Sequence, residues 1–291
     1  MNLKDLLVRE DIDPEHVLAF RQWPQEPRLR NVLGWLAAEQ PGVFNAFQQT
    51  QWATTEKAME KAAYLASFIG YKPHLALFVG LYSVGGSRPI SRKEFWQIPE
   101  NVELRKLGMT GFSESDVRSS VLLFDLSLTD FCASWKGKLI VNWPLPAQRW
   151  WRWVNRSDIQ IHAILEDSAL VRPIKNWDQI ALSWAELAVL PVPWRQALEQ
   201  WRGIYYIFDT SDGKGYVGSA SGETNLLGRW LTYSASGHGG NRLLRERNPE
   251  HFRFSILQRV SPDMVGSDVV QLEANWKNRL HTRKPFGLND N

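Results

Sequence analysis

Apolar side chains recur at helical spacing through the first 70 residues of the chain. One helix face is marked by Leu29, Val32, Leu33, Leu36 and Ala37, which follow the i, i+3, i+4 pattern. A second stretch of the same kind spans residues 43–69, after the helix-starting pair Pro41-Gly42. The pattern therefore predicts a mainly helical N-terminal region over residues 1–70.

Beyond Gly70 the apolar positions form short runs instead. These runs lie at residues 75–82, 121–128, 138–143 and 159–164, and the first is closed by Gly85-Gly86. Short runs rich in aliphatic and aromatic residues, with turns between them, are typical of strands. Several such strands favour a small, closed or half-closed β-barrel. We therefore expect a barrel-like domain over residues 71–170.

Residues 171–200 are punctuated by Trp and Pro and predict a packed connector with a helix near 177–190. The segment 201–291 then alternates strand and helix patterns. Strands are predicted at 203–208, 215–219 and 251–258, and helices at 225–233, 241–247 and 269–281. Ser267 or Asp268 would cap the last helix.

The first two strands of this segment are joined by a hairpin signal, Asp212-Gly213. If these two residues form the whole loop, Tyr216 faces Asp209 on the neighbouring strand. Side chains alternate between the two faces of a strand, so Tyr205 and Tyr216 would lie on the same face of the sheet.

Length and composition exclude several classes of protein for this chain. A chain of 291 residues is long enough for about two domains. No apolar run reaches the length of about 20 residues that spans a bilayer, and the N-terminus lacks a signal-peptide pattern. The single cysteine, Cys132, excludes an internal disulfide and a multi-cysteine zinc site. We therefore expect a cytoplasmic protein without a membrane partner.

The positive charge is concentrated near the C-terminus. Residues 201–291 hold 12 Lys and Arg against 9 Asp and Glu, whereas residues 1–200 hold 22 of each. Lys and Arg clusters can bind nucleic-acid phosphates without sequence preference. The other interpretation of such a surplus is an ordinary solvated surface.

Two glycine-anchored tyrosine motifs carry most of the chemical information. They are Gly203-Ile204-Tyr205 and Tyr216-Val217-Gly218, and they are followed by Arg229, Tyr233, Glu273 and Asn289. In this order, the motifs of residues 202–291 resemble those of the GIY-YIG nuclease superfamily. The second motif departs from the family pattern by having valine at its centre. Asn291 is the second choice for the late asparagine.

The resemblance implies an α+β domain with a small central sheet, flanking helices and phosphodiesterase activity. Glu273 would hold Mg²⁺ or Mn²⁺, which prefer oxygen ligands. Arg229 would grip a phosphate with its planar guanidinium. Tyr205 would orient or deprotonate the attacking water, and Tyr216 would position the phosphate or support Tyr205.

The resemblance also assigns supporting roles. Tyr233 can share the role of base, and Asn289 would support the site without reacting. Alternatives stay open for the charged residues: Glu273 can be a surface carboxylate paired with Lys277 at i, i+4, and Arg229 a solvated cation. His238, in a glycine-rich loop, is either catalytic or a bystander.

The N-terminal part resembles PUA-like readers of modified bases. A base flipped out of a duplex needs aromatic rings to stack on and hydrogen bonds to its edge. The residues that match this chemistry are Tyr82, Trp96, Asn142, Trp143 and Trp150. The same aromatic residues are also explained as core side chains.

These observations predict a metal-dependent endonuclease of double-stranded DNA, with an N-terminal reader of modified cytosines and a role in restriction or phage defence. The alternatives are a sequence-specific restriction enzyme, a structure-specific repair nuclease, or a DNA-binding protein whose nuclease-like part does not cleave. One site cuts one strand, so a double-strand break would need a homodimer or a second binding event.

Overall fold

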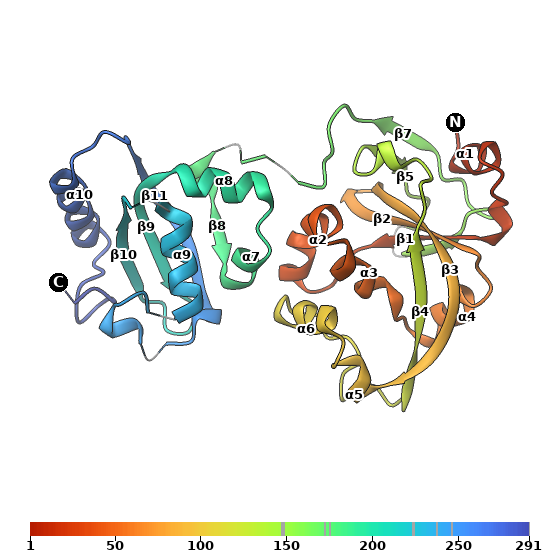
Figure 1. The fold of residues 1–291 in the computed structure, drawn as a ribbon, viewed down its shortest axis with the longest axis horizontal. Coiled ribbons are helices and arrows are strands. Elements are labelled where there is room, and N and C mark those ends of the chain that lie inside the picture. The colour runs from red at the N-terminus through yellow and green to blue at the C-terminus, as the bar shows by residue number, and fades with distance from the viewer. Residues whose placement is uncertain are drawn as a thin grey trace. The chain divides into compact units, whose positions relative to one another are not determined.

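The chain folds into two compact units, each with its own sheet and helices. The computed structural model describes residues 1–146, 149–171, 173–174, 176–222, 225–236, 238–245 and 247–290. Contacts group residues Met1–Arg172 into unit 1 and residues Pro173–Asn291 into unit 2. Both units mix helices and strands, so the α+β class is confirmed (Figure 1). The four segments expected from the sequence remain a proposal about domain organisation.

Unit 1 contains a mixed, curled sheet. Its helices are α1 (Leu3–Arg9), α2 (Pro27–Glu39), α3 (Pro41–Gln49), α4 (Ala53–Met59), α5 (Arg92–Phe95) and α6 (Pro99–Lys106). Its strands are β1 (Val17–Gln22), β2 (Tyr64–Lys72), β3 (Leu75–Ser91), β4 (Ser120–Leu128), β5 (Leu139–Asn142), β6 (Trp151–Trp153) and β7 (Ile161–Ile164). The hydrogen-bonded order is β6-β1-β2-β3-β5-β7, with β4 also paired to β3.

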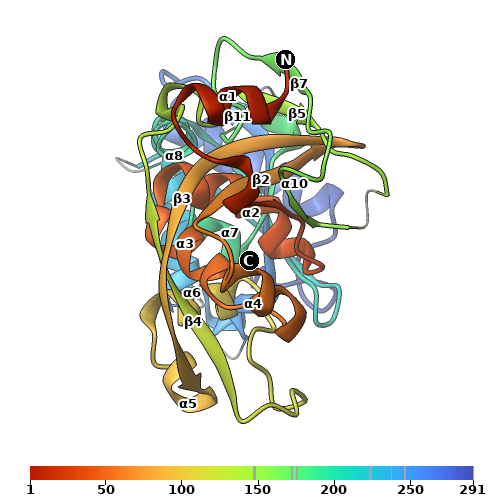
Figure 2. The same ribbon diagram turned by 90° about the vertical axis from the view of Figure 1, so that its right-hand side faces the viewer.

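Strand β3 organises this sheet because three other strands pair with it along its length. One edge pairs with β2, and the other pairs first with β5 and then with β4. Figure 2 shows β3 and β4 running side by side along the unit. Register shifts interrupt the pairing of β3 with β2 and with β4, and such bulges bend a strand. The two faces of the sheet carry separate hydrophobic clusters, centred on residues such as Phe68 and Phe20.

Several predicted elements of unit 1 were wrong. Residues 64–69 form the start of β2 and not the end of a helix, because α4 ends at Met59. An apolar run such as Ala62–Ile69 fits a buried strand as well as a buried helix, so spacing alone does not separate them. The sequence patterns also missed β1. Gly85-Gly86 does not end β3, because the strand passes through these residues at an irregular step of its pairing with β4.

Unit 2 contains an antiparallel sheet of order β10-β9-β11-β8. Its strands are β8 (Ala181–Ser183), β9 (Arg202–Asp209), β10 (Gly215–Ala220) and β11 (Phe252–Val260). Its helices are α7 (Trp184–Ala188), α8 (Val192–Gln200), α9 (Asn225–Ser236) and α10 (Gly266–Arg279). The strands and the two long helices agree closely with the sequence patterns.

The remaining differences in unit 2 concern two of the expected helices and one helix cap. The helix expected near 177–190 is a short turn followed by β8 and α7. The helix expected at 241–247 is a 3-10 turn at Arg242–Leu244. Helix α10 begins at Gly266 without a side-chain cap, so neither Ser267 nor Asp268 caps it. Among the described residues, no helix has the length and apolarity needed to cross a bilayer.

The core of unit 1 is open to a direct test with two matched leucines. Leu81 on β3 is fully buried, whereas Leu145 lies in a loop and is 72 % exposed. We expect Leu81→Ala to lower the free energy of unfolding by about 2–5 kcal/mol, because it removes buried methyl groups and leaves a cavity. Leu145→Ala should change it by less than about 0.5 kcal/mol. Urea denaturation measures both, and equal effects would contradict the assigned core.

Candidate functional site

The ring of Tyr205 lies against the backbone of Gly218. Tyr205 on β9 and Gly218 on β10 are direct partners in the antiparallel pairing. A Cβ at Gly218 would overlap the phenol of Tyr205. The missing side chain therefore makes the space in which Tyr205 is buried, with 1 % of its surface exposed. This explains why a glycine closes the second motif.

The three tyrosines of the site form a chain of hydroxyl groups. The Tyr205 hydroxyl donates to the Tyr233 hydroxyl at 3.2 Å, and the Tyr233 hydroxyl donates to that of Tyr216 at 3.1 Å. The ring centroids lie 5.7–6.4 Å apart. These two hydrogen bonds join the neighbouring strands β9 and β10 to helix α9.

The hairpin register differs from the sequence expectation by two residues. Tyr216 pairs with Ile207, not with Asp209, and the connecting loop is longer than Asp212-Gly213. Ion pairs from Arg247 to Asp209 and Asp212, at 2.6 and 2.9 Å, tie down this loop. Because side chains alternate with a period of two, a shift of two residues leaves every side chain on its expected face. Tyr205 and Tyr216 therefore do share a face.

Glu273 approaches the same edge strand from the α10 side. The residue next to Gly218, Ser219, points to the opposite face and donates a short hydrogen bond to the Glu273 carboxylate. Lys277, one turn along α10, pairs with the other oxygen of Glu273 at 2.8 Å. Both charged side chains are largely buried, with 17 % and 7 % exposure. The pairing with Lys277 exists, but it is not a pair of solvated surface charges.

Electrostatic effects connect these groups across β10. Burial raises the pKa of Tyr216 well above its ordinary value, with further contributions from Tyr233 and from the Glu273 carboxylate. Burial also raises the pKa of Tyr205, and Tyr233 and Tyr216 raise it further. The charge of Arg229 lowers this pKa, but by less than the other groups raise it. Both phenols are therefore protonated at neutral pH. In that state they donate and accept hydrogen bonds but do not act as bases.

Arg229 lies on α9, one turn before Tyr233, and is exposed. Among the described residues, no ion-pair or hydrogen-bond partner is found for its guanidinium. An exposed and unpaired guanidinium beside buried phenols is available to an anionic ligand.

Asn289 is held against the middle of β10. Its side-chain amide donates to the Val217 carbonyl at 2.8 Å and accepts from the Val217 N–H at 2.9 Å. This contact supports the strand that carries Tyr216 and Gly218. Asn291, the second choice, lies outside the described residues. His238 is partly exposed, and its Nδ1 accepts the Gly240 N–H at 3.0 Å.

The donor set near Glu273 fits a hard divalent cation with one protein ligand. No cluster of three or more His, Cys, Asp or Glu side chains that could hold a metal is found in the described part of the chain. Mg²⁺ commonly binds through one or two carboxylates and keeps several waters. A carboxylate has about four lone-pair positions, so Glu273 retains acceptor capacity beyond Ser219 and Lys277. The sequence patterns did not identify Ser219, whose signal is its place beside Gly218.

The residues expected to form a base-reading pocket are distributed over unit 1. Tyr82 and Trp143 are buried in the clusters on opposite faces of the sheet. Trp96 is half-buried, and its indole N–H donates to the Phe112 carbonyl at 3.1 Å. Asn142 ends β5, opposite Leu75. Trp150 packs on Phe20 and lines a cavity of unit 1. The five residues are therefore not brought together in one place.

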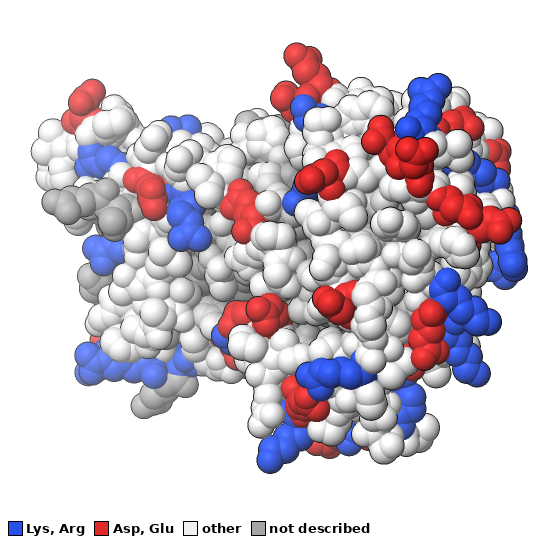
Figure 3. Space-filling model, turned by 45° about the vertical axis from the view of Figure 1, so that its right-hand side comes forward, with Lys and Arg blue, Asp and Glu red and all other residues white. Residues whose placement is uncertain are grey.

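Charged side chains of both signs are mixed on one face of the molecule. On the face drawn in Figure 3, Lys and Arg side chains are interspersed with Asp and Glu among the coloured residues.

Two solved structures are similar to this chain. The catalytic domain of homing endonuclease I-TevI has 26 % sequence identity, covering 31 % of this chain and 98 % of that chain, with a TM-score of 0.27. A mutant of the catalytic domain of intron endonuclease I-TevI has 24 % identity, covering 31 % and 93 % of the two chains, with a TM-score of 0.26. No protein-family model and no curated protein matches the chain. Because both TM-scores are low, we interpret the site from its own geometry.

The contact of Tyr205 with Gly218 predicts a difference between two glycine substitutions. Gly218→Ala should lower the free energy of unfolding by about 1–3 kcal/mol, because the new methyl group overlaps a buried ring. The matched control is Gly222→Ala, where no atom lies within 4 Å of the added Cβ. Urea denaturation followed by near-UV circular dichroism measures both variants. A Gly218→Ala protein as stable as the control would contradict the contact.

The raised phenol pKa values predict an alkaline loss of stability. The folded state holds the protons of Tyr205 and Tyr216 more tightly than the unfolded state, whose tyrosines ionise near pH 10. The stabilisation is therefore complete below about pH 10 and is lost as the pH rises further. The free energy of unfolding should fall less steeply in this range for Tyr216→Phe than for the wild type. Parallel pH profiles would show that the Tyr216 phenol is not perturbed.

Proposed function

We propose that unit 2 hydrolyses phosphodiester bonds in DNA, as a nuclease of the GIY-YIG type. The observation that carries this proposal is the arrangement around β10 of three linked phenols on one face, the Glu273 carboxylate on the other face, and the exposed guanidinium of Arg229 on α9. Phosphodiester hydrolysis needs an oriented water, neutralisation of the phosphate oxygens and stabilisation of the leaving oxygen. Phenols, a carboxylate and a guanidinium are residue types that can supply these three functions. The order of the motifs along the chain also supports a phosphodiesterase.

Each residue has a role that follows from its surroundings. Arg229 binds the phosphate, because its guanidinium is exposed and unpaired among the described residues. Tyr205 is kept protonated by burial, so it acts through its hydroxyl, which donates to Tyr233, and not as the base. The Tyr233 hydroxyl links this hydroxyl to that of Tyr216, and the Glu273 carboxylate contributes to the raised pKa of Tyr216. Asn289 fixes the strand beneath them.

Glu273 is the residue that would hold Mg²⁺ or Mn²⁺. A divalent cation there would neutralise phosphate charge and lower the pKa of a bound water. Lys277 pairs with Glu273 in the protein alone, and it balances the buried carboxylate. Ser219 fixes the orientation of the same carboxylate.

The finer assignment rests on the organisation of the whole chain. We propose that unit 1 selects the target and that the enzyme serves in restriction or phage defence by acting on double-stranded DNA with modified cytosines. A nuclease unit with one site cleaves one strand, so a homodimer or two successive binding events would complete a double-strand break.

Glu273→Gln tests the cleavage site. It preserves side-chain shape and removes the charge, so we expect cleavage to fall by about 100-fold or more. The matched control is Glu250→Gln, an exposed glutamate of the same unit. The assay follows nicking and linearisation of plasmid and phage DNAs, including hydroxymethylated and glucosylated DNA, with Mg²⁺, Mn²⁺ or EDTA.

The same assay separates the alternatives. EDTA should abolish cleavage by the wild type. Cleavage by Glu273→Gln at the rate of the control would refute the site. DNA binding without cleavage by the wild type, on every DNA and with either metal, would instead indicate a binding protein.

A further inference from the structure

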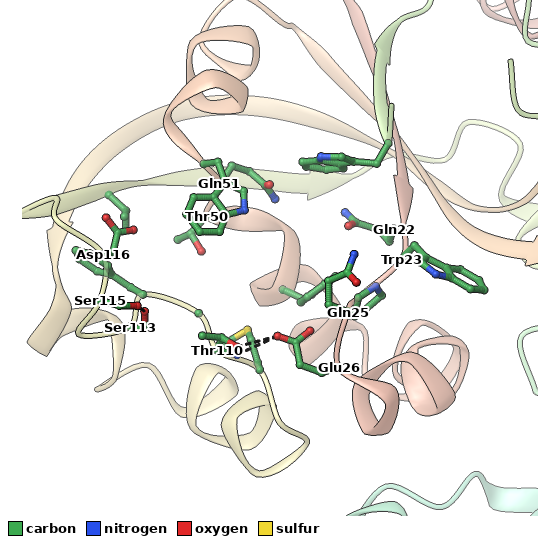
Figure 4. A pocket seen from close by; sticks show the side chains of 18 of the residues that line it. Gln22, Trp23, Gln25, Glu26, Thr50, Gln51, Thr110, Ser113, Ser115 and Asp116 are labelled. Carbon is green, nitrogen blue, oxygen red and sulfur yellow. Dashed lines mark hydrogen bonds between the residues drawn. The ribbon is translucent and has the colours of Figure 1, made fainter. Parts of the chain in front are cut away.

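Unit 1 contains a cavity of about 610 Å³ that is lined by Trp150 but by none of the other four residues expected to read a base. Its walls come from three separated stretches and one further aromatic residue: the end of β1 and the following loop, the end of α3 and its link to α4, the segment 109–121, and Trp150. Figure 4 shows these walls from close by. A volume of this size lies within the range of pockets that enclose small organic ligands.

The clearest sign of a ligand is the side-chain amide of Gln22. This side chain lines the cavity and has only 4 % of its surface exposed. Its Nε2 atom is buried, and no hydrogen-bond partner for it is found among the described residues. Leaving a buried donor unpaired costs about 1–3 kcal/mol, so native proteins rarely do so without reason. Figure 4 shows the Gln22 amide turned toward the cavity.

Two other amides reach the same space. Gln25 and Gln51 line the cavity from different segments, and Figure 4 shows their amide groups turned toward it with that of Gln22. Gln51 uses its Nε2 on the Gln48 carbonyl, at 3.0 Å, and so presents an acceptor. A planar amide offers a donor and an acceptor side by side, which matches the edge of a nucleobase.

Aromatic rings complete the cavity. Trp52 lines it while 67 % of its surface is exposed, which is unusual for so large an apolar side chain. The guanidinium of Arg118 lies over the Trp52 ring, 5.9 Å from its centroid, and is itself held by Asp116 and Glu56. Trp150 packs against Phe20 in a tilted arrangement, with ring centroids 4.9 Å apart. Indole rings near amide groups are suited to stack on a flat heterocycle.

We propose that this cavity receives a cytosine base flipped out of DNA, with space for a bulky substituent on that base. The inference rests on the proposed function, because it makes unit 1 the part that selects the DNA on which unit 2 acts. The cations Arg21 and Arg118 are matched in the lining by the acids Glu26 and Asp116, so the cavity is suited to a neutral heterocycle and not to a bare phosphate. Its volume exceeds what an unmodified pyrimidine needs.

The test measures binding without cleavage. The full chain carrying Glu273→Gln is titrated in EDTA against fluorescent duplexes that differ in one base pair, and anisotropy reports binding. That base is cytosine, 5-methylcytosine, 5-hydroxymethylcytosine or glucosylated 5-hydroxymethylcytosine. We expect at least about tenfold tighter binding to a duplex with an enlarged cytosine than to the unmodified duplex.

Two pocket variants and one control locate the effect. Gln22→Met keeps the length of the side chain and removes the amide, and Trp52→Ala removes the exposed ring. Each should lose the preference for the enlarged base by about tenfold. Gln97→Ala, an exposed glutamine of the same unit, should retain it. Because Gln22 Nε2 is unpaired in the protein alone, Gln22→Met should melt at or above the temperature of its parent.

The outcomes distinguish the two proposals. Equal binding to all four duplexes, or a preference that survives both pocket variants, would overturn the cavity assignment and leave the nuclease assignment intact. A clear drop in the melting temperature of Gln22→Met without a change in preference would show that Gln22 is structural, which also overturns it. Failure of the nuclease assignment appears separately, as wild-type cleavage that does not depend on Glu273.

Discussion

The close approach of Tyr205 to the backbone of Gly218 is the contact on which the candidate site depends. It buries the phenol beneath α9, and that burial brings the Tyr205 hydroxyl to Tyr233 and, through it, to Tyr216. Gly203 plays a corresponding role on the other edge of β9, where a Cβ would overlap the Gln258 carbonyl of β11. The two motif glycines thus mark the places where a strand must accept a neighbour at very short range.

Burial of the phenols also decides what they can do chemically. A tyrosine whose pKa is raised by desolvation stays neutral, and it organises a site through hydrogen bonds. The charged side chains of the site lie outside this group of phenols: Glu273 is largely buried and paired with Lys277, and Arg229 is exposed. The arrangement therefore separates a rigid neutral centre from a charged periphery.

Sequence patterns predicted unit 2 better than unit 1, for physical reasons. The strands that carry Tyr205 and Tyr216 are bounded by clear turn residues. The predicted register of their pairing was wrong by two residues, and because this number is even, the prediction that both side chains share a face was still right. In unit 1 the run Ala62–Ile69 is apolar on all sides, so its period could not distinguish β2 from a helix. The aromatic residues Tyr82 and Trp143 were equally ambiguous, and packing placed them in the two cores.

The cavity of unit 1 was beyond the reach of sequence patterns. Its amides come from β1, from the loop after it and from the residue before Trp52, and only the folded chain brings them together. What distinguishes Gln22 from the other glutamines is a missing hydrogen-bond partner among the described residues, which is a property of three-dimensional surroundings. Local spacing carries no information about it.

The hydrogen bonds of residues 288 and 289 affect whether a second copy of the protein can pair with the edge strand β10. Strand β10 is the outer strand of its sheet, and such a strand normally displays unpaired backbone groups to solvent. Here the Leu288 N–H donates to the Gly215 carbonyl at 2.9 Å, and the Asn289 amide satisfies both backbone groups of Val217. The stretch from Gly215 to Val217 is therefore closed to pairing with a strand from a second copy.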